Sequence, residues 1–500
     1  MFFTSTRARL NIDAAAAIAR GISAEGGLFV PSEFPALTPA FLARLIPMTY
    51  RERAAEILSL LLPGFTKEEV KSCVDSAYTG SFDNDEPAPL YALSPEIRML
   101  ELWHGPTCAF KDLALQILPF LLTKAIGKSS PGRTAVILVA TSGDTGKAAL
   151  AGFADVPGTK IIVFFPQNGV SPIQKLQMTT QEGANTGVCA IEGNFDDAQS
   201  GVKKIFADES MARFLAARNM AFSSANSINF GRLAPQIVYY VSAYCDMVRE
   251  GRIVQGEKIN AAVPTGNFGN ILAAVYAKRM GLPLGRLICA SNRNNILTDF
   301  LRTGVYDRNR PFYTTSSPSM DILISSNLER LLYHLHGNDP EATGALMAQL
   351  ASAGRYEVSP AILGQLKAEF YGGFCDEAET RRTIGELFRE KHYLCDPHTA
   401  VAVKVYGDYV RETGDGTPCV IASTASPFKF ARPVLESIDA NPVPEEDFAA
   451  LRRLADLSGK TVPRPLAELG TKEIRHRTCV SKEGMAEFIR TFLDRGRPRR

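Results

Sequence analysis

The middle of the chain alternates short apolar runs with longer stretches of helical character. The first run, Thr134 to Ala140, has the sequence TAVILVA and is rich in β-branched residues. Segments such as Leu233 to Val248 and Ile271 to Met280 carry apolar residues at helical spacing. Five further runs are expected to be strands: Lys160 to Phe165, Val188 to Glu192, Ala221 to Ser224, Ile259 to Val263 and Leu287 to Ala290. Near-continuous apolar strands between helices predict an α/β fold, with doubly wound parallel sheets covered on both faces.

The flanking regions are mostly helical in pattern. Apolar runs broken by Pro and Gly occupy the first 95 residues, among them Ala14 to Ile18, Ala40 to Ile46 and Ala54 to Leu62. A long helical region is expected from Asp321 to Glu390, and a last strand from Pro418 to Ala422. The expected parts are an N-terminal helical domain (1–95), a large α/β domain (96–131 and 236–440), a small α/β domain (132–235) and a C-terminal helical wrap (441–500).

Composition narrows the function classes. Lys plus Arg total 55 and Asp plus Glu 53, so the net charge is +2, which argues against a nucleic-acid or membrane partner because both favour a concentrated basic field. The apolar runs are too short to span a bilayer, and polar residues follow Met1-Phe2-Phe3 at once, so no signal peptide is expected. Nine cysteines without a CxxC pair are typical of reduced, mostly buried thiols in a cytoplasmic protein. The six scattered histidines predict no metal site, and His104 and His398 are expected to be structural.

Two strand-to-helix turns carry residues suited to binding an anion. Thr141 to Lys147 has the sequence TSGDTGK, and Pro264 to Asn270 has the sequence PTGNFGN. Small residues let main-chain N–H groups approach an anion, and the N-terminus of the following helix adds a favourable partial charge. The first turn fits a capped helix equally well, since Ser, Thr and Asp are ordinary N-caps. The second favours a phosphate cradle, but it is neither GxGxxG nor a Walker sequence, which disfavours a dinucleotide or a nucleoside triphosphate.

A third segment places one lysine at a turn-to-helix junction. Lys111 follows Phe110 and precedes the apolar stretch Leu113 to Ile126. Taken alone, such a lysine is best interpreted as a surface residue with a partly buried stem. Beside two anion-binding turns another interpretation gains weight, because a partly desolvated lysine has a lowered pKa and can form an imine with an aldehyde.

Together these features resemble the fold-type II pyridoxal-phosphate enzymes, and more closely the threonine synthases. HGPTCAFKD (residues 104–112) is similar to the cofactor-lysine motif of that family, and TSGDTGKAA (141–149) to its substrate and cofactor loop. Further similar segments are EGGLFVP (25–31), ANSINFGR (225–232), PTGNFGN (264–270), SPSMDILISSNLERLL (317–332) and DPHTAVA (396–402). The resemblance covers most of the chain.

The resemblance implies a role for each matched residue. Lys111 is expected to hold pyridoxal 5′-phosphate as a Schiff base, Asp144 to lie near the phenolic oxygen of the cofactor, and Thr424 to contact its pyridine nitrogen. The cofactor phosphate is expected to be cradled by the main-chain amides of Gly266, Asn267, Phe268, Gly269 and Asn270. The phosphate of the substrate is expected to be surrounded by Ser142, Thr145, Ser227, Asn229 and Arg232. Without the resemblance, Arg232 would be interpreted as a helix-face ion pair and Ser227 as a helix cap.

One motif departs from the family. Around Thr424 the family often has histidine and alanine where this chain has Ser426 and Phe428. If that histidine contacts the ligand in relatives, the polarity of the pocket differs here.

The activity implied is that of a threonine synthase, which converts O-phospho-L-homoserine and water to L-threonine and phosphate. Lys111 would be both the cofactor anchor and the general base. Two alternatives stay open: a threonine synthase-like lyase that releases 2-oxobutyrate, and a non-catalytic phosphate-ligand binding protein on the same fold. A monomer and a homodimer are both compatible with the sequence.

Overall fold

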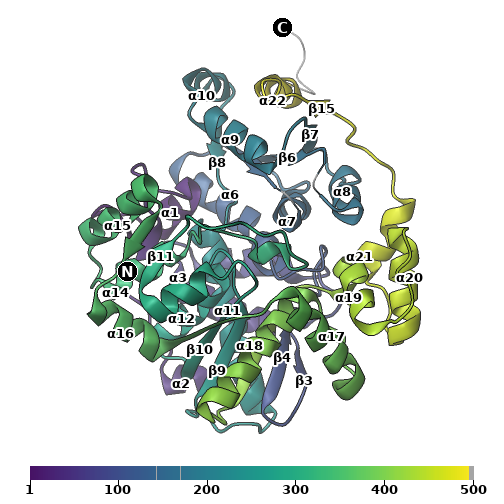
Figure 1. Cartoon of the computed structure of the whole chain (residues 1–500). Coiled ribbons are helices and arrows are strands. Elements are labelled where there is room, and N and C mark those ends of the chain that lie inside the picture. Colours follow the sequence, from purple (N-terminus) through teal and green to yellow (C-terminus); the bar gives the residue numbers. More distant parts are fainter. Residues whose placement is uncertain (142, 169, 495–500) are drawn as a thin grey trace.

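The computed structural model describes residues 1–141, 143–168 and 170–494 of the chain. Its main strands form two sheets that lie in separate halves of the molecule (Figure 1). The large sheet has the order β13-β10-β9-β14-β4-β3, with bounds Phe370–Phe374, Leu284–Ser291, Ile259–Pro264, Cys419–Ser423, Ile97–Glu101 and Leu90–Ala92. The small sheet has the order β15-β7-β6-β5-β8, with bounds Cys479–Val480, Thr186–Ile191, Thr159–Pro166, Thr134–Ala140 and Met220–Ser223. Apart from β3, which pairs antiparallel with β4, neighbouring strands in both sheets are parallel.

Helices cover both faces of each sheet. In the large sheet, Ala261 and Val263 of β9 face a core shared with α11 (Phe230–Arg249) and α12 (Gly269–Arg279), whereas Ala262 faces a second core. That second core is built with α17 (Glu377–Lys391), α18 (Pro397–Thr413) and α19 (Ala431–Ile438). Burial on both faces explains why these strands are apolar at successive positions rather than at alternate ones.

The small sheet is built in the same way. Ile137 and Val139 of β5 face α6 (Leu118–Ser129) and α7 (Asp144–Phe153), and Val136 and Leu138 face the opposite core. The helices on that opposite side are α9 (Phe195–Phe206), α10 (Glu209–Ala216) and α22 (Met485–Asp494). The expected fold, an α/β architecture with two doubly wound parallel sheets, is confirmed.

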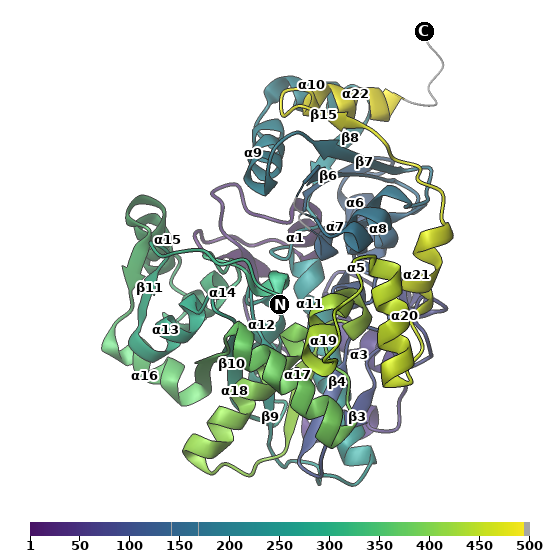
Figure 2. The same cartoon turned by 45° about the vertical axis from the view of Figure 1, so that its right-hand side comes forward.

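The N-terminal and C-terminal segments of the chain pack against the two sheets and their helices. The helices of the first hundred residues are α1 (Ala14–Arg20), α2 (Pro39–Leu45), α3 (Tyr50–Leu61) and α4 (Lys67–Tyr78), preceded and interrupted by the paired strands β1 (Phe3–Ser5) and β2 (Phe29–Pro31). At the other end, α20 (Asp447–Ser458) and α21 (Arg464–Ala467) lie beside α19, and the chain then runs to β15 and α22 on the small sheet (Figure 2). The same C-terminal segment therefore contacts both halves of the molecule.

The expectation of a continuous helical region from Asp321 to Glu390 is wrong in part. It contains α14 (Leu328–Leu335), α15 (Pro340–Ala353), α16 (Pro360–Glu369) and all but the last residue of α17, but two strands interrupt them. β12 (Arg355–Glu357) pairs with β11 (Val305–Asp307), and β13 forms an edge of the large sheet. The sequence of β13 is FYGGF, and two adjacent glycines disfavour a helix, while pairing with β10 satisfies the extended backbone.

The remaining helices are α5 (Asp112–Leu115), α8 (Pro172–Thr179) and α13 (Ile296–Thr303), with short 3-10 turns at Pro318–Met320, Pro427–Phe430 and Glu468–Thr471. Eight of the nine cysteines are buried and Cys479 is exposed. Within the described residues, no helix has the length and apolar character needed to cross a membrane.

Candidate active site

The residues expected to bind the cofactor follow the carboxyl ends of four parallel strands. Lys111 lies after β4 and directly precedes α5, and Asp144 opens α7 after β5. The turn from Gly266 to Asn270 joins β9 to α12, and Thr424 follows β14. Ligands in open α/β sheets bind at this edge, where loops from several strands meet.

Lys111 lies in a nearly buried environment with few polar neighbours. Its Nζ donates to the Ser319 hydroxyl at 3.1 Å, lies 3.7 Å from Asp144 Oδ2 and sits 5.5 Å from the centre of the Phe110 ring. Burial lowers the pKa of Lys111, while the Asp144 carboxylate opposes that shift and the Lys429 cation adds to it. A lowered pKa favours the neutral amine, which is the form that attacks a carbonyl or accepts a proton.

Asp144 is held as a carboxylate by a second lysine, which the sequence reasoning missed. Lys429 Nζ lies 2.6 Å from Asp144 Oδ1 and also donates to the Thr107 carbonyl at 2.9 Å. Gln174 donates to the same carboxylate oxygen at 3.1 Å. Burial alone would raise the pKa of Asp144, but Lys429 and then Lys111 hold it below its usual range.

The turn between β9 and α12 has the shape of an anion cradle. Phe268 adopts a left-handed backbone (φ 62°) and opens α12 at its N-cap, where its side chain offers no acceptor to the first amides of the helix. A side chain on Gly266 would place Cβ only 2.4 Å from the Ser319 carbonyl oxygen, so the turn needs glycine there. Asn270 accepts from the hydroxyls of Tyr239 and Tyr240 through Oδ1, whereas its buried Nδ2 has no partner in the described part of the chain.

Thr424 lies against the segment that carries Lys111. Its carbonyl accepts from the Phe110 amide at 2.8 Å, and Ala109 and Ala425 form an isolated antiparallel bridge. Ser426, where relatives often have histidine, is fully buried; its amide donates to the Cys108 carbonyl and its hydroxyl accepts from the Phe428 amide. Ser426 therefore stabilises the turn after β14.

Arg232 is a buried cation with few partners. It lies in the first turn of α11 and is 3% exposed. Among the described residues, Nη1 donates to the Ala225 carbonyl at 3.1 Å and Nε has no partner. Burial lowers the pKa of Arg232 to about 10, and the Arg232 cation in turn contributes to the lowered pKa of Lys111.

The other residues expected around the substrate phosphate differ in surroundings. Asn229 is the N-cap of α11: it accepts from the Gly231 amide and donates to the carbonyls of Ile18 and Ser224. Thr145, in the first turn of α7, and Ser227, in the loop before α11, are half-buried. Ser142 lies outside the described residues. The contacts of Asn229 are all internal, so its expected role at a ligand stays a prediction.

These residues fit pyridoxal phosphate. The cofactor requires an amine, an anion cradle and a polar group for its ring, and Lys111, the turn from Gly266 to Asn270, and Asp144 with Thr424 offer these at one edge of the sheets. The unpartnered Nδ2 of Asn270 and the uncapped N-terminus of α12 are donors suited to a phosphate. Within the described residues, no cluster of His, Cys, Asp or Glu is arranged to hold a metal ion.

Comparison with known proteins shows to which class of enzyme the chain belongs. Residues 97–424 match the profile of the family described as pyridoxal-phosphate dependent enzyme. The structure is also similar to the crystal structure of pyridoxal-phosphate-bound threonine synthase from Brucella melitensis (TM-score 0.87, 35% identity), over 98% of this chain and 99% of that one. The fold and the site define a fold-type II pyridoxal-phosphate enzyme.

The particular family follows from the ends of the chain and from its relatives. Residues 2–78 match the threonine synthase N terminus and residues 399–483 the threonine synthase C-terminal family. Threonine synthase from Pseudomonas aeruginosa is 39% identical over 83% of this chain and 85% of its own. Human threonine synthase-like 1 is 41% identical over 87% of this chain, which spans 59% of that longer relative. The chain belongs to the threonine synthase family of pyridoxal-phosphate-dependent enzymes.

Proposed function

We propose that the protein converts O-phospho-L-homoserine and water to L-threonine and phosphate. The observation that carries the proposal is the buried guanidinium of Arg232, which has a single carbonyl acceptor among the described residues and whose charge lowers the pKa of Lys111. A buried cation without a carboxylate partner is costly unless a ligand supplies the anion. A phosphate ester would supply it, and the guanidinium fork suits phosphate oxygens.

Two other buried arginines, Arg53 and Arg330, contrast with Arg232. Arg53 pairs with Asp246 at 2.7 Å and also donates to Ser242 and to the carbonyls of Leu45 and Ile46. Arg330 donates to the carbonyls of Phe29 and Ile228 and to Asn327. Both are satisfied within the protein, and each ties distant segments together. Arg232, with one carbonyl acceptor among the described residues, has donors left for a ligand.

The side chains can be assigned steps in this reaction. When bound, pyridoxal phosphate acts as an electron sink for the substrate carbons. The Lys111 amine, with its lowered pKa, would take a proton from the substrate α-carbon and then from the β-carbon. Arg232 would hold the phosphate in place until it departs from the γ-carbon. A proton is then delivered to the γ-carbon, which becomes the methyl group, water adds at the β-carbon, and protonation at the α-carbon completes threonine.

Product analysis tests the proposal. Purified holoenzyme given phosphohomoserine is expected to release threonine and phosphate in equal amounts. Release of phosphate with 2-oxobutyrate would instead assign the lyase activity, and binding without any product would assign a non-catalytic ligand-binding protein.

We also propose a cytoplasmic protein that acts on a small molecule, as a monomer or a homodimer. The mostly buried thiols and the near-neutral net charge of +2 support this. The four-part domain division, with the small α/β domain at 132–235, is likewise a proposal.

A further inference from the structure

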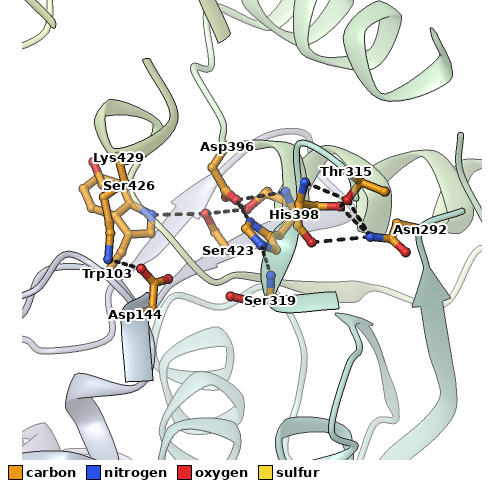
Figure 3. A network of polar contacts seen from close by, with 12 residues as sticks. Trp103, Asp144, Asn292, Thr315, Ser319, Asp396, His398, Ser423, Ser426 and Lys429 are labelled. Carbon is orange, nitrogen blue, oxygen red and sulfur yellow. Dashed lines mark hydrogen bonds and ion pairs between the residues drawn. The ribbon is translucent and has the colours of Figure 1, made fainter. Parts of the chain in front are cut away.

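The segment at the start of α18 has no part in the proposed function, yet its side chains form a buried polar network (Figure 3). The network is connected to Lys111 through Ser319. Asp396, the N-cap of α18, is 0% exposed, and His398 is 2% exposed. Asp396 Oδ1 accepts from the His398 amide at 2.9 Å and from His398 Nδ1 at 2.7 Å, and the Thr399 hydroxyl donates to Oδ2. The imidazole is thereby fixed in one orientation.

The other ring nitrogen of His398 holds a neighbouring segment. The main-chain N–H of Ser319 donates to His398 Nε2 at 3.2 Å. Because Nδ1 faces a carboxylate, it carries the ring proton, and Nε2 is free to accept. An imidazole that bridges a carboxylate and a main-chain amide acts as a spacer of fixed length between α18 and Ser319.

Ser319 in turn lies between the two parts of the cofactor site. Its hydroxyl accepts from Lys111 Nζ at 3.1 Å. Its carbonyl oxygen is so close to Gly266 that a Cβ there would lie 2.4 Å away. On the far side of the segment, Asn292 Nδ2 donates to Ser317 Oγ at 3.0 Å and to Asp321 Oδ1 at 2.8 Å. A shift of the Ser319 main chain would therefore move the group that orients the lysine amine.

We propose that Ser319 is a catalytic residue whose hydroxyl orients the Lys111 amine, and that His398 and Asp396 are positioning residues that hold Ser319 in place. The inference requires that pyridoxal phosphate binds at Lys111, and it is argued from the contacts of the described residues. It does not depend on the identity of the substrate. It assigns a role to the segments SPSMD (317–321) and DPHTA (396–400).

The test is the rate at which the full chain, stripped of cofactor by dialysis, captures added pyridoxal phosphate, followed by visible absorbance. Ser319→Ala removes the acceptor of the amine and is expected to slow capture about tenfold, the size of effect that loss of one hydrogen bond gives. His398→Asn keeps a polar group at the Nδ1 position but is too short to reach Ser319, and should slow capture by a similar factor. His398→Gln places an amide oxygen near the Nε2 position and should restore the rate to within about threefold of the original chain.

The double variant Ser319→Ala with His398→Asn distinguishes positioning from a general structural effect. If His398 acts through Ser319, the double variant captures no more slowly than the slower single variant. His334, also buried and bonded to Tyr276 and Asn338, is the matched control: His334→Asn should lower stability and leave capture unchanged. Capture by His398→Asn at the original rate, or slowing in the double variant equal to the product of the two single effects, would overturn the inference. Because no phosphohomoserine is used, this result is independent of the proposed reaction.

Discussion

Lys429 and Asp144 form a buried ion pair, with 2.6 Å between Nζ and Oδ1, and Lys111 faces the other carboxylate oxygen at 3.7 Å. One carboxylate thus lies between two lysines. The nearer lysine neutralises it, so that Asp144 raises the pKa of Lys111 less than an unpaired carboxylate would.

Removing that cation should shift the pH dependence of the enzyme. In Lys429→Met the pKa of Lys111 is expected to rise, since Lys429 lowers it, and the neutral amine then requires a higher pH. The Lys111 amine is free only in the substrate complex, so the acid limb of the pH profile of kcat should move to higher pH, whereas Lys429→Arg should leave it in place. Loss of one partner of a buried pair also costs about 3–5 kcal/mol of unfolding free energy, which denaturant titration measures. An acid limb that moves to lower pH in Lys429→Met would contradict this account.

Arg232 should act on affinity for phosphate more than on stability. Arg232→Met removes a buried cation that has one carbonyl acceptor in the described chain, so the unfolding free energy should stay the same or rise, while kcat/KM for phosphohomoserine falls by about two to three orders of magnitude. Added inorganic phosphate should stabilise the holoenzyme by about 2.7 kcal/mol at a hundred times its Kd. That stabilisation should disappear in Arg232→Met.

Arg330→Met is the matched control for this prediction. It removes three satisfied hydrogen bonds, and should therefore lower stability while the folded protein still responds to phosphate. Equal phosphate stabilisation in the original chain and in Arg232→Met would show that the guanidinium does not face the ligand.

Gly266 should tolerate no side chain. In Gly266→Ala the new methyl would meet the Ser319 carbonyl at 2.4 Å, so the turn must move, and the Kd for pyridoxal phosphate, measured by absorbance titration, should rise at least tenfold. Gly364, inside α16, is the control, because a Cβ there would meet no atom within 4 Å. Gly364→Ala should stabilise the helix by about 0.5–1 kcal/mol and leave the Kd unchanged. Unchanged affinity in both variants would refute the close approach.

His104 should make stability depend on pH. Burial opposes its charge, but Asp83 and Glu101 raise the pKa of His104 to about 9. The group binds its proton more tightly in the folded state, so its contribution is fully present below about pH 6.5 and is lost as pH rises through about 9. His104→Gln should cost on the order of 2 kcal/mol at pH 6 and little at pH 10, by urea unfolding at each pH. If the loss of unfolding free energy in His104→Gln instead increased with pH, the predicted direction of the pH dependence would be wrong.

The central strands of the two sheets can be predicted from local sequence, whereas strands such as β13 and β4 cannot. Thr134–Ala140 and the other apolar runs are buried on both faces, so their composition alone indicates strands, and β5 has the predicted bounds. β13 was not predicted because the two glycines of FYGGF weaken its strand pattern, and its extended backbone is stabilised by pairing with β10. β4, with the sequence IRMLE, is similarly short, and its apolar residues are interrupted by Arg98 and followed by Glu101.

The residues of the site likewise differ in whether local sequence predicts them. Lys111, Asp144 and the turn at Gly266 stand in motifs whose residue types already point to an amine and an anion cradle. Lys429, Ser319 and His398 lie in or beside motifs of the family, but their roles depend on contacts between residues that are 79 to 322 positions apart in the sequence. Periodicity and turn chemistry carry no information on such pairings.

The most direct test of the central claim is to run the reaction in water enriched in heavy oxygen and to locate the label by mass spectrometry. The proposed chemistry breaks the bond between the γ-carbon and the ester oxygen and adds water at the β-carbon. It therefore predicts labelled threonine and unlabelled phosphate. Labelled phosphate together with homoserine would mean that water attacks phosphorus, and would contradict the account.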